Sequence, residues 1–346
     1  MRTASVATVS NVEAAFDRFW HPVARASELG DLPLHVELLG RHYVVVALDG
    51  GLRAFEDSCP HRSFPLSHGD LVEGTLRCPY HGYRFDGEGR CVFIPALPPG
   101  LAVPPKAGLR PAGGVATHLD WVWLAPDEPC QPLPELPEFF EDRFGKVVLG
   151  PYTWNAGAAQ MTDNFLDVSH FPFVHAGTFG IESDAVIPSF SVDRQGLNFS
   201  YSYHHEFRNG AEASALQGVH SPSQHRRIRS SFFPPFGTVF RVDYEESGVV
   251  TVVFSVSQPV SARTSRLWTI LLSTDIDADT EESARTFEEK ILFEDQSILE
   301  KYREPEMVLD LEAQFHTHAD RMTVEFRRVL AEILFGVPGG KRGAQP

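Results

Sequence analysis

The sequence predicts an α+β protein of two domains, an all-β N-terminal domain followed by a domain of antiparallel strands and helices. Three observations lead to this prediction: β-prone segments joined by tight turns in the first third, a proline-rich interruption, and later strands that precede two helical patterns. Strands and helices in separate blocks indicate α+β, because a parallel βαβ fold needs them to alternate. A chain of 346 residues is long enough for each domain to bury a core of its own.

Short strands and tight turns characterise the segment from His35 to about Pro126. Runs of β-branched and aromatic residues bounded by Gly and Asp predict strands and hairpins. The expected strands are His35–Leu39, Arg41–Leu48, Leu52–Phe55 and His118–Leu124. The expected hairpin turns are Asp49–Gly51 and Asp86–Gly89.

Prolines mark the boundary between the two domains. Five of the twelve residues from Pro126 to Pro137 are proline, which favours an extended connection over a helix or a central strand. We therefore expect residues 1–135 to form the first domain and residues 136–346 the second. Strands of the second domain are expected at Gly196–Phe207, Phe232–Tyr244, Gly248–Val256 and Arg266–Leu272. Helices are expected at Thr280–Tyr302 and at about Pro305–Leu334.

Charge and hydropathy exclude some classes of partner. The net charge of −16 argues against nucleic acid or an anionic membrane surface, because phosphates attract Lys and Arg. Residues Met1–Phe16 lack the apolar core of a signal peptide, and the longest apolar run, Tyr43–Leu48, is too short to span a bilayer. Four cysteines are too few for a disulfide framework in a chain of this size. A cytoplasmic protein that binds neither nucleic acid nor membrane is therefore expected.

Two Cys-His pairs form the first chemical constellation. Cys59-Pro-His61 is followed, after sixteen residues, by Cys78-Pro-Tyr-His81. Two thiolates and two imidazoles suit either zinc or an iron-sulfur cluster with mixed ligands. Ligand types and spacing favour the cluster over zinc or over unconnected buried residues. The other two cysteines, Cys91 and Cys130, fit no paired ligand spacing and are expected to be structural.

A second constellation lies on a predicted helix that begins near Met161. Asn164, Asp167 and His170 recur every third residue on one face. Such a polar stripe is usually a solvated helix surface. Here, however, the apolar segment Phe171–Val174 follows and ends at His175, which argues against full exposure.

The two histidines of this segment need a bend between them to share a metal. In a continuous helix His170 and His175 would point about 140° apart. Pro172 biases Phe171 out of the helical region, so the chain can turn and bring His175 back. Two imidazoles and one carboxylate would make the facial triad of non-haem Fe(II) oxygenases.

The third ligand is expected on the predicted helix Thr280–Tyr302. Asp295 lies near the middle of its apolar stripe, where a carboxylate needs a proton, a cation or a metal. Taken alone, this position favours an ion pair with a buried arginine or a cap of hydroxyl groups over a metal; the metal-binding role is what the family resemblance implies. Glu294 points about 80° away and is expected to be solvated, whereas Glu288 is closer to the stripe and is the fallback ligand.

Three motifs resemble one known family. The segment Cys59–Cys91 (CPHRSFPLSHGDLVEGTLRCPYHGYRFDGEGRC) resembles the Rieske box of ring-hydroxylating and demethylating oxygenases, with Phe64 and Tyr80 where respiratory Rieske proteins carry a disulfide. The segment Asn164–His175 (NFLDVSH-x4-H) resembles their iron-binding segment. Glu294–Glu300 is similar to the segment that carries the third ligand in the vanillate demethylase and dicamba monooxygenase type.

The resemblance implies two metal centres. A 2Fe-2S Rieske cluster would bind Cys59, His61, Cys78 and His81, and a mononuclear Fe(II) would bind His170, His175 and Asp295. Asn164 would belong to the catalytic segment. Asp167 would link His170 to His81 of a neighbouring subunit in a homotrimer. The fold implied is a Rieske domain followed by a helix-grip catalytic domain.

The resemblance also implies an activity and its partners. Electrons from NAD(P)H would come through a separate reductase, with or without a ferredoxin, because the chain has neither a dinucleotide fingerprint nor plant-type ferredoxin cysteine spacing. Dioxygen would then hydroxylate or oxidatively demethylate an aromatic or polycyclic small molecule. Ring cis-dihydroxylation is the alternative reaction. A Rieske electron-transfer protein without oxygenase activity, or a zinc-stabilised binding protein, is the alternative of another class.

Substrate identity is not readable from the sequence. Phe165, Phe173 and the aromatic segment Ser231–Phe236 are candidates for the substrate pocket, although such rings pack sheets equally well.

Overall fold

The computed structural model describes residues 6–176, 178–208 and 223–336. The chain divides into two compact units, Ala14–Leu133 and Pro134–Pro346, and Met1–Glu13 belongs with the second. The division falls inside the proline-rich segment, but the N-terminal residues differ from the expectation. Strand β1 (Thr8–Val9) pairs with β19 (Met307–Val308), which ties residues assigned to the first domain to the second unit. The ends of the expected domains, residues 1–5 and 337–346, lie outside the described residues.

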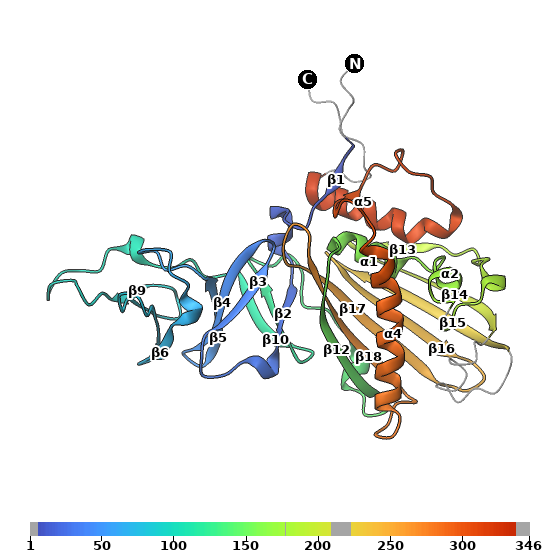
Figure 1. Ribbon diagram of the computed structural model, residues 1–346, viewed down its shortest axis with the longest axis horizontal. Helices are drawn as coiled ribbons and strands as arrows, with labels where there is room; N and C mark the ends of the chain where they lie inside the picture. The colour runs from blue at the N-terminus through green and yellow to red at the C-terminus, as the bar shows by residue number, and fades with distance from the viewer. Residues whose placement is uncertain (1–5, 177, 209–222, 337–346) are drawn as a thin grey trace, which may run out of the picture. The chain divides into compact units, whose positions relative to one another are not determined.

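The first unit consists of three small antiparallel sheets, with strand orders β10-β11-β2, β3-β4-β5 and β6-β7-β8-β9 (Figure 1). Its strands are β2 (His21–Arg25), β3 (Leu34–Leu38), β4 (Arg41–Leu48), β5 (Gly51–Glu56), β6 (Asp70–Val72), β7 (Thr75–Arg77), β8 (Arg84–Phe85), β9 (Cys91–Phe93), β10 (Gly114–His118) and β11 (Trp121–Ala125). Alternate residues of β4 and β5, among them Val44, Val46 and Phe55, form a core that also contains Cys59 and Cys78. The same packing that folds this unit therefore anchors both cysteine loops.

One strand expected in this unit is a hairpin. Leu119 and Asp120 both have positive φ, 49° and 60°, so the backbone reverses there and His118–Leu124 cannot continue as one strand. The reversal pairs β10 with β11, His118 facing Trp121. The single strand was predicted wrongly because the residues after the turn are apolar and a two-residue turn of Leu and Asp lacks the usual Gly or Asn signal.

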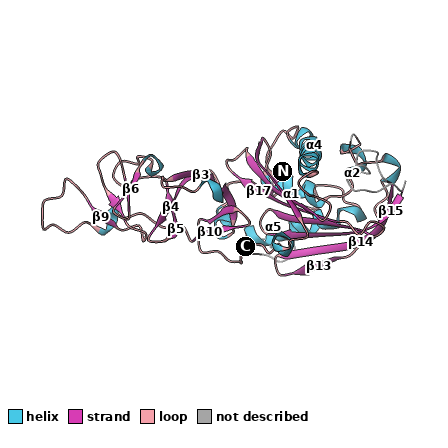
Figure 2. Cartoon of the chain, turned by 90° about the horizontal axis from the view of Figure 1, so that it is seen from below, coloured by secondary structure: helices cyan, strands magenta, loops and turns pink. Residues whose placement is uncertain are grey.

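The second unit is built on a seven-stranded antiparallel sheet with the order β12-β18-β17-β16-β15-β14-β13. Its strands are β12 (Gly145–Trp154), β13 (Val192–Gln195), β14 (Asn198–Arg208), β15 (Ser223–Phe233), β16 (Gly237–Tyr244), β17 (Val250–Pro259) and β18 (Ser265–Ser273). Its helices are α1 (Ala158–Leu166), α2 (Phe171–Val174), α4 (Glu281–Leu299) and α5 (Arg321–Phe335). Helix α4 crosses one face of the sheet (Figure 1), and Figure 2 shows α2 on the same side of the strands as α4.

Two elements of this unit differ from the expectation. The strand expected at Phe232–Tyr244 is divided into β15 and β16 by a turn at Pro234-Pro235, because proline has no N–H for the ladder. The helix expected from Pro305 begins only at Arg321. Its first residues instead form β19, whose backbone groups pair with β1 and are not available to a helix.

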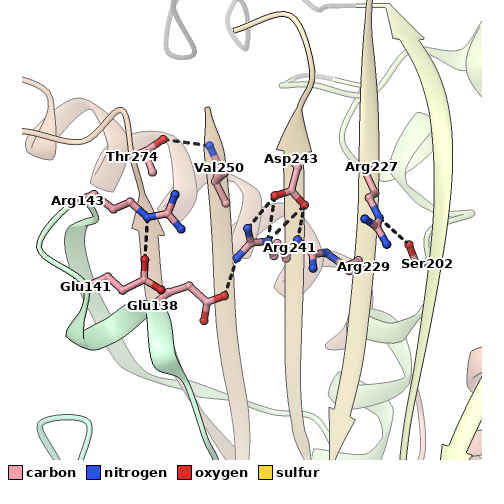
Figure 3. Close-up of polar contacts among 10 residues, drawn as sticks. All are labelled: Glu138, Glu141, Arg143, Ser202, Arg227, Arg229, Arg241, Asp243, Val250 and Thr274. Carbon is pink, nitrogen blue, oxygen red and sulfur yellow. Dashed lines mark hydrogen bonds and ion pairs between the residues drawn. The ribbon is translucent and has the colours of Figure 1, made fainter. Parts of the chain in front are cut away.

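Strand alternation gives the sheet two different faces. Odd-numbered residues of β15 and β16 form an ion network on the face opposite α4 (Figure 3). The Asp243 carboxylate accepts hydrogen bonds from Arg229 at 2.7 Å and from Arg241 at 2.7 Å. Arg241 also donates to the Glu138 carboxylate at 2.6 Å. Since successive side chains point to opposite faces, the even-numbered residues of the same strands point toward α4. These even-numbered side chains line a cavity on the α4 side of the sheet.

Two candidate metal centres and a cavity

Cys59 and Cys78 begin two loops of the same shape in the first unit. In the first loop the Cys59 N–H donates to the carbonyl of Phe64 at 2.9 Å, and the Ser63 N–H donates to the carbonyl of Cys59 at 2.8 Å. The second loop repeats both bonds from Cys78 and Gly82. Ser63 and Gly82 occupy the equivalent position, with φ of 52° and 69°. The sequence therefore folds each box into the same tight turn.

The two loops bring four ligand atoms together. The Nδ1 atoms of His61 and His81 lie 3.1 Å apart at an exposed edge, while Cys59 and Cys78 are buried. Burial raises the pKa of the Cys59 thiol, and backbone N–H groups that bond its sulfur oppose the rise. Two buried sulfurs and two imidazole nitrogens at the edge are the donor set of a cluster ligated by cysteine on one iron and histidine on the other.

An aromatic contact joins the two loops. The rings of Phe64 and Tyr80 lie 5.5 Å apart, at the positions where respiratory Rieske proteins have a disulfide. His61 stacks on Tyr83 with ring centres 4.8 Å apart. Ring packing therefore connects the loops here in place of a covalent bond.

His170 and His175 lie at the two ends of the one-turn helix α2. Helix α1 ends at Leu166, and Asp167 is already extended with ψ of 124°. The expected position of the bend was therefore wrong: the chain leaves the helix at Asp167, and Pro172 lies in the first turn of a new helix, where a missing N–H costs nothing. As the residues flanking one turn, His170 and His175 direct their Nε2 atoms to within 3.2 Å of each other.

Asp295 completes a triangle of ligand atoms. Its Oδ1 lies 3.4 Å from the Nε2 of His170 and 3.3 Å from the Nε2 of His175, and it has no hydrogen bond within the described residues. Corners of a triangle with sides near 3.3 Å lie about 1.9 Å from its centre, which suits metal–ligand bonds of about 2.1 Å. The three residues therefore fit a first-row metal bound on one face.

The charges of the triangle favour a cation. Burial opposes the protonation of His170, but the carboxylates of Asp167 and Asp295 outweigh it and raise the pKa of His170 to about 9. Burial likewise opposes ionisation of Asp295, yet the two histidines lower the pKa of its carboxyl to about 2. A carboxylate and two imidazoles that together stabilise positive charge are suited to a divalent metal, which would take the place of the proton on His170.

A cavity of about 170 Å³ lies against the triangle. Its walls come from α2, α4 and the even-numbered positions of β15 and β16, and it reaches His170, His175 and Asp295. Most of the lining is aromatic or aliphatic, as in Phe165, Phe171, Phe179, Phe240, Ile291 and Leu292. A mainly apolar cavity with a few polar groups is the usual form of a small-molecule site.

Each of the two units matches a known protein-family model. The family model of the Rieske [2Fe-2S] domain matches residues 19–112, and that of the vanillate O-demethylase oxygenase C-terminal domain matches residues 154–334, just over half of the chain. The chain belongs to the Rieske non-haem iron oxygenases.

Relatives of this oxygenase cover most of its length. Methylxanthine N1-demethylase NdmA of Pseudomonas putida is 29% identical over 322 residues, which are 91% of this chain and 88% of the relative. Dicamba O-demethylase of Stenotrophomonas maltophilia, an oxygenase component, is 35% identical over 45% of this chain and 46% of its own. The structure of P. putida NdmA with caffeine superposes with a TM-score of 0.78 at 25% identity, covering 95% of this chain and 98% of that one. Dicamba monooxygenase bound to dicamba shares the fold, with a TM-score of 0.76 at 20% identity over 95% and 98% of the two chains.

The oxygenase is an enzyme with two metal cofactors, a Rieske 2Fe-2S cluster and a mononuclear iron, and it draws its electrons from a separate reductase. It is a component of a multicomponent system. No helix in the described ranges is long and apolar enough to cross a membrane.

Glu294, which was expected to be solvated, is a residue of the site. Its Oε2 lies 2.8 Å from the Nδ1 of His175 and accepts a hydrogen bond of 2.9 Å from the Thr178 hydroxyl. A carboxylate on the far nitrogen of a ligand histidine sets its tautomer and raises its basicity. The expectation was wrong because α4 turns Glu294 toward α2, which is 119 residues away in sequence. Glu294 and Asp295, which are adjacent on α4, thus lie against opposite ring nitrogens of His175.

Asp167 and Asn164 lie beside the triangle but outside the cavity. The Oδ2 of Asp167 is 3.6 Å from the Nδ1 of His170, too long for a hydrogen bond, and its Oδ1 accepts two bonds from Ser169. The Nδ2 of Asn164 is buried and has no hydrogen-bond partner in the described chain. Both residues line a separate polar depression of about 420 Å³.

The remaining candidates are divided by the fold. Glu288, the fallback ligand, does not join the metal-binding group but lines the cavity. Phe165 lines the cavity as expected, whereas Phe173 is 60% exposed and does not. The aromatic segment Ser231–Phe236 packs within the unit: Phe232 lies against Phe326, with ring centres 5.2 Å apart. The alternation of side chains along β15 and β16 would have identified the lining residues of these strands if the turn at Pro234-Pro235 had been predicted.

Proposed function

We propose that this oxygenase removes an N- or O-linked methyl group from a small aromatic or heteroaromatic molecule, as a monooxygenase. The observation that carries the proposal is the triangle of His170, His175 and Asp295 at the wall of an apolar cavity. The similar proteins named as methylxanthine and dicamba demethylases support the reaction class. The balance is one substrate, O₂, two electrons and two protons, giving the demethylated product, formaldehyde and water.

The residues have distinct roles in this proposal. Cys59, His61, Cys78 and His81 hold the cluster, and His170, His175 and Asp295 hold the iron. When bound, the iron supplies dioxygen activation with electrons from the cluster. The aromatic walls orient a flat substrate and exclude water.

Electron transfer between subunits of a homotrimer is part of the proposal. Asp167 and Asn164 line a polar depression on α1 whose rim includes Tyr302, 61% exposed, and Phe315, 91% exposed. An exposed aromatic rim around unpaired buried polar groups suits a protein contact. We propose that His81 of a neighbouring subunit meets Asp167 there. A separate NAD(P)H-dependent reductase, with or without a ferredoxin, and a cytoplasmic location complete the proposal.

Formaldehyde release tests the reaction. The holoenzyme with a generic Rieske reductase, NADH and ¹⁸O₂ is offered methyl ethers, N-methyl heterocycles and unmethylated polycyclic compounds. Demethylation predicts one formaldehyde per product and per NADH. A product that gains one oxygen without formaldehyde identifies hydroxylation, and gain of two oxygens identifies dihydroxylation; either contradicts the proposed reaction.

Replacing Asp167 tests the link between centres. For Asp167→Ala we expect unchanged cluster absorbance and iron content, with turnover reduced by about 100-fold or more, because the carboxylate proposed to stand between His170 and His81 of the neighbouring subunit is lost. Single-turnover oxidation of the reduced cluster in the presence of substrate measures the step directly. Wild-type rates in this variant would contradict the bridging role.

A further inference from the structure

One carboxyl in the cavity wall has no partner among the residues that the structure describes. Four carboxyl side chains are buried among the described residues: Asp17, Asp57, Glu288 and Asp295. Asp17 pairs with Arg41, Asp57 accepts two hydrogen bonds from Ser67, and Asp295 faces two histidines. Glu288, 7% exposed, has no hydrogen bond and no ion pair with any described residue.

An unpaired buried carboxyl is costly, which makes its position informative. Burial without a hydrogen bond disfavours the ionised form, and here burial, reinforced by the charge of Asp295, raises the pKa of Glu288 to about 7. Near neutral pH such a carboxyl can accept or donate a hydrogen bond. A ligand that supplies the missing partner would remove the cost.

The distance along α4 between Glu288 and Asp295 matches the length of a small aromatic ligand. It lies on the buried stripe of α4 with Leu292 and Asp295, seven residues before the metal-facing carboxylate. Seven residues of α-helix are about 10 Å along the axis, roughly the length of a one- or two-ring molecule. Thr251 and Ser255 line the same cavity on the sheet side, and its remaining lining is largely apolar.

We propose that Glu288 binds an N–H or O–H group of the substrate and so holds a neutral aromatic or heteroaromatic molecule with its methyl group toward His170, His175 and Asp295. The inference rests on the proposed demethylation and specifies its substrate class. A substrate carboxylate beside Glu288 would face the carboxyl groups of Glu288 and Asp295, which line the same cavity. Acidic substrates are therefore disfavoured there. Arg226, at the wall, is the cationic side chain among the described lining residues outside the histidine pair.

Equilibrium binding to the anaerobic holoenzyme tests the inference. Titration calorimetry compares matched pairs of methoxy- and N-methyl-aromatics, one member with a free O–H or N–H and the other with that group methylated, together with the corresponding carboxylates. We expect the donor-bearing member to bind wild type at least about 10-fold more tightly. Glu288→Gln should keep part of this preference, and Glu288→Leu should abolish it. Glu282→Gln, in the exposed first turn of α4, is the matched control and should behave as wild type.

Each outcome decides between the two proposals. Cluster absorbance and iron content establish that the variants are folded. Equal affinity for both members of every pair, binding of none of them, tighter binding of the carboxylates, or a preference that survives in Glu288→Leu would overturn the role of Glu288. A Glu288-dependent preference without formaldehyde release would keep that role and reject demethylation. Formaldehyde release without the preference would do the reverse.

Discussion

At the scale of single residues, the site depends on two adjacent acids with different tasks. Asp295 turns its Oδ1 to the Nε2 atoms of both histidines, whereas Glu294 bonds the Nδ1 of His175. One helix can present both, because successive side chains on α4 are about 100° apart and α2 lies against that edge. The choice of ligand and of orienting residue therefore follows from the helix rotation.

Removing the charge of Glu294 should weaken the metal site without destroying it. For Glu294→Gln we expect iron affinity and turnover to fall about 10- to 100-fold, because His175 loses the carboxylate that sets its tautomer. Iron content after dialysis against a graded chelator measures the effect. The same substitution at Glu282, 86% exposed on the same helix, should change neither quantity. Equal losses in both variants would mean that Glu294 acts only through net charge.

His21 should make the first unit sensitive to acid. It is fully buried, and burial lowers its pKa to about 4, although its Nε2 bonds the carbonyl of Phe16. The unfolded chain binds a proton near pH 6.5 while the folded chain does not. Stability is therefore retained above pH 6.5 and lost as the pH falls toward 4, by about 2 kcal/mol at pH 5.

Unfolding at two pH values checks this prediction. Between pH 7.5 and pH 5 the melting midpoint of the cluster absorbance should fall more in wild type than in His21→Gln, which cannot be protonated. The exposed His68, substituted in the same way, serves as control. A wild-type loss no greater than that of His21→Gln would show that another group sets the acid limit.

At the scale of elements, an ion pair connects helices that are distant in sequence. Arg327 of α5 is 6% exposed and meets the carboxylate of Asp163 of α1 at 3.0 Å through its Nη2. Burial raises the pKa of Asp163, and the charge of Arg327 opposes the rise. Helix α1 ends one residue before Asp167, so this pair also supports the approach to the metal site.

Breaking the pair should destabilise the second unit. For Arg327→Met we expect a loss of roughly 3 kcal/mol, because Asp163 keeps a poorly solvated charge without a partner. The neighbouring Arg328→Met removes only a surface pair with Glu325 and should cost less than about 1 kcal/mol. Urea unfolding of both variants provides the comparison, and adding Asp163→Asn to Arg327→Met should recover part of the loss. Similar midpoints for the two single variants would contradict the assignment.

The predicted elements were most accurate where local signals are strong. The expected strand Arg41–Leu48 coincides with β4, because β-branched residues and the Asp49-Gly50 turn agree there. The long helix expected from Pro305 was wrong, since residues 307–308 pair with a strand about 300 residues earlier. Local periodicity cannot detect such a partner.

At the scale of the whole molecule, the proposed trimer has a consequence that a monomer lacks. If the cluster of one subunit serves the iron of the next, two inactive variants can restore activity together. Cys59→Ser lacks the cluster and His175→Ala lacks the iron. A head-to-tail trimer that contains both variants should place an intact cluster beside an intact iron at one interface, about a third of the total.

Subunit exchange tests this expectation. The two variants, carrying different affinity tags, are unfolded together and refolded with iron and sulfide, and doubly tagged oligomers are purified. We expect these doubly tagged trimers to show turnover of about a third of wild type per subunit, while each variant alone is inactive. Doubly tagged trimers without turnover would exclude transfer between subunits.

The sequence alone predicted the cluster residues and the two histidines, because each pair lies in a short motif whose spacing reflects local geometry: Cys-x-His and Cys-x2-His in turns, and two histidines flanking a proline. Asp295 was predicted from the apolar stripe of its helix together with the family resemblance. It also determined the separation into a β-rich unit and an α+β unit. Tertiary structure decided which carboxyl orients His175, which residues line the cavity and that Glu288 has no partner within the described part of the chain. Those features depend on how α4 is rotated over the sheet and on which strands pair. The rotation of α4 depends on contacts such as that of Glu294 with His175, 119 residues apart, and the strand pairing depends on turns whose residues gave no clear signal. Local patterns encode neither.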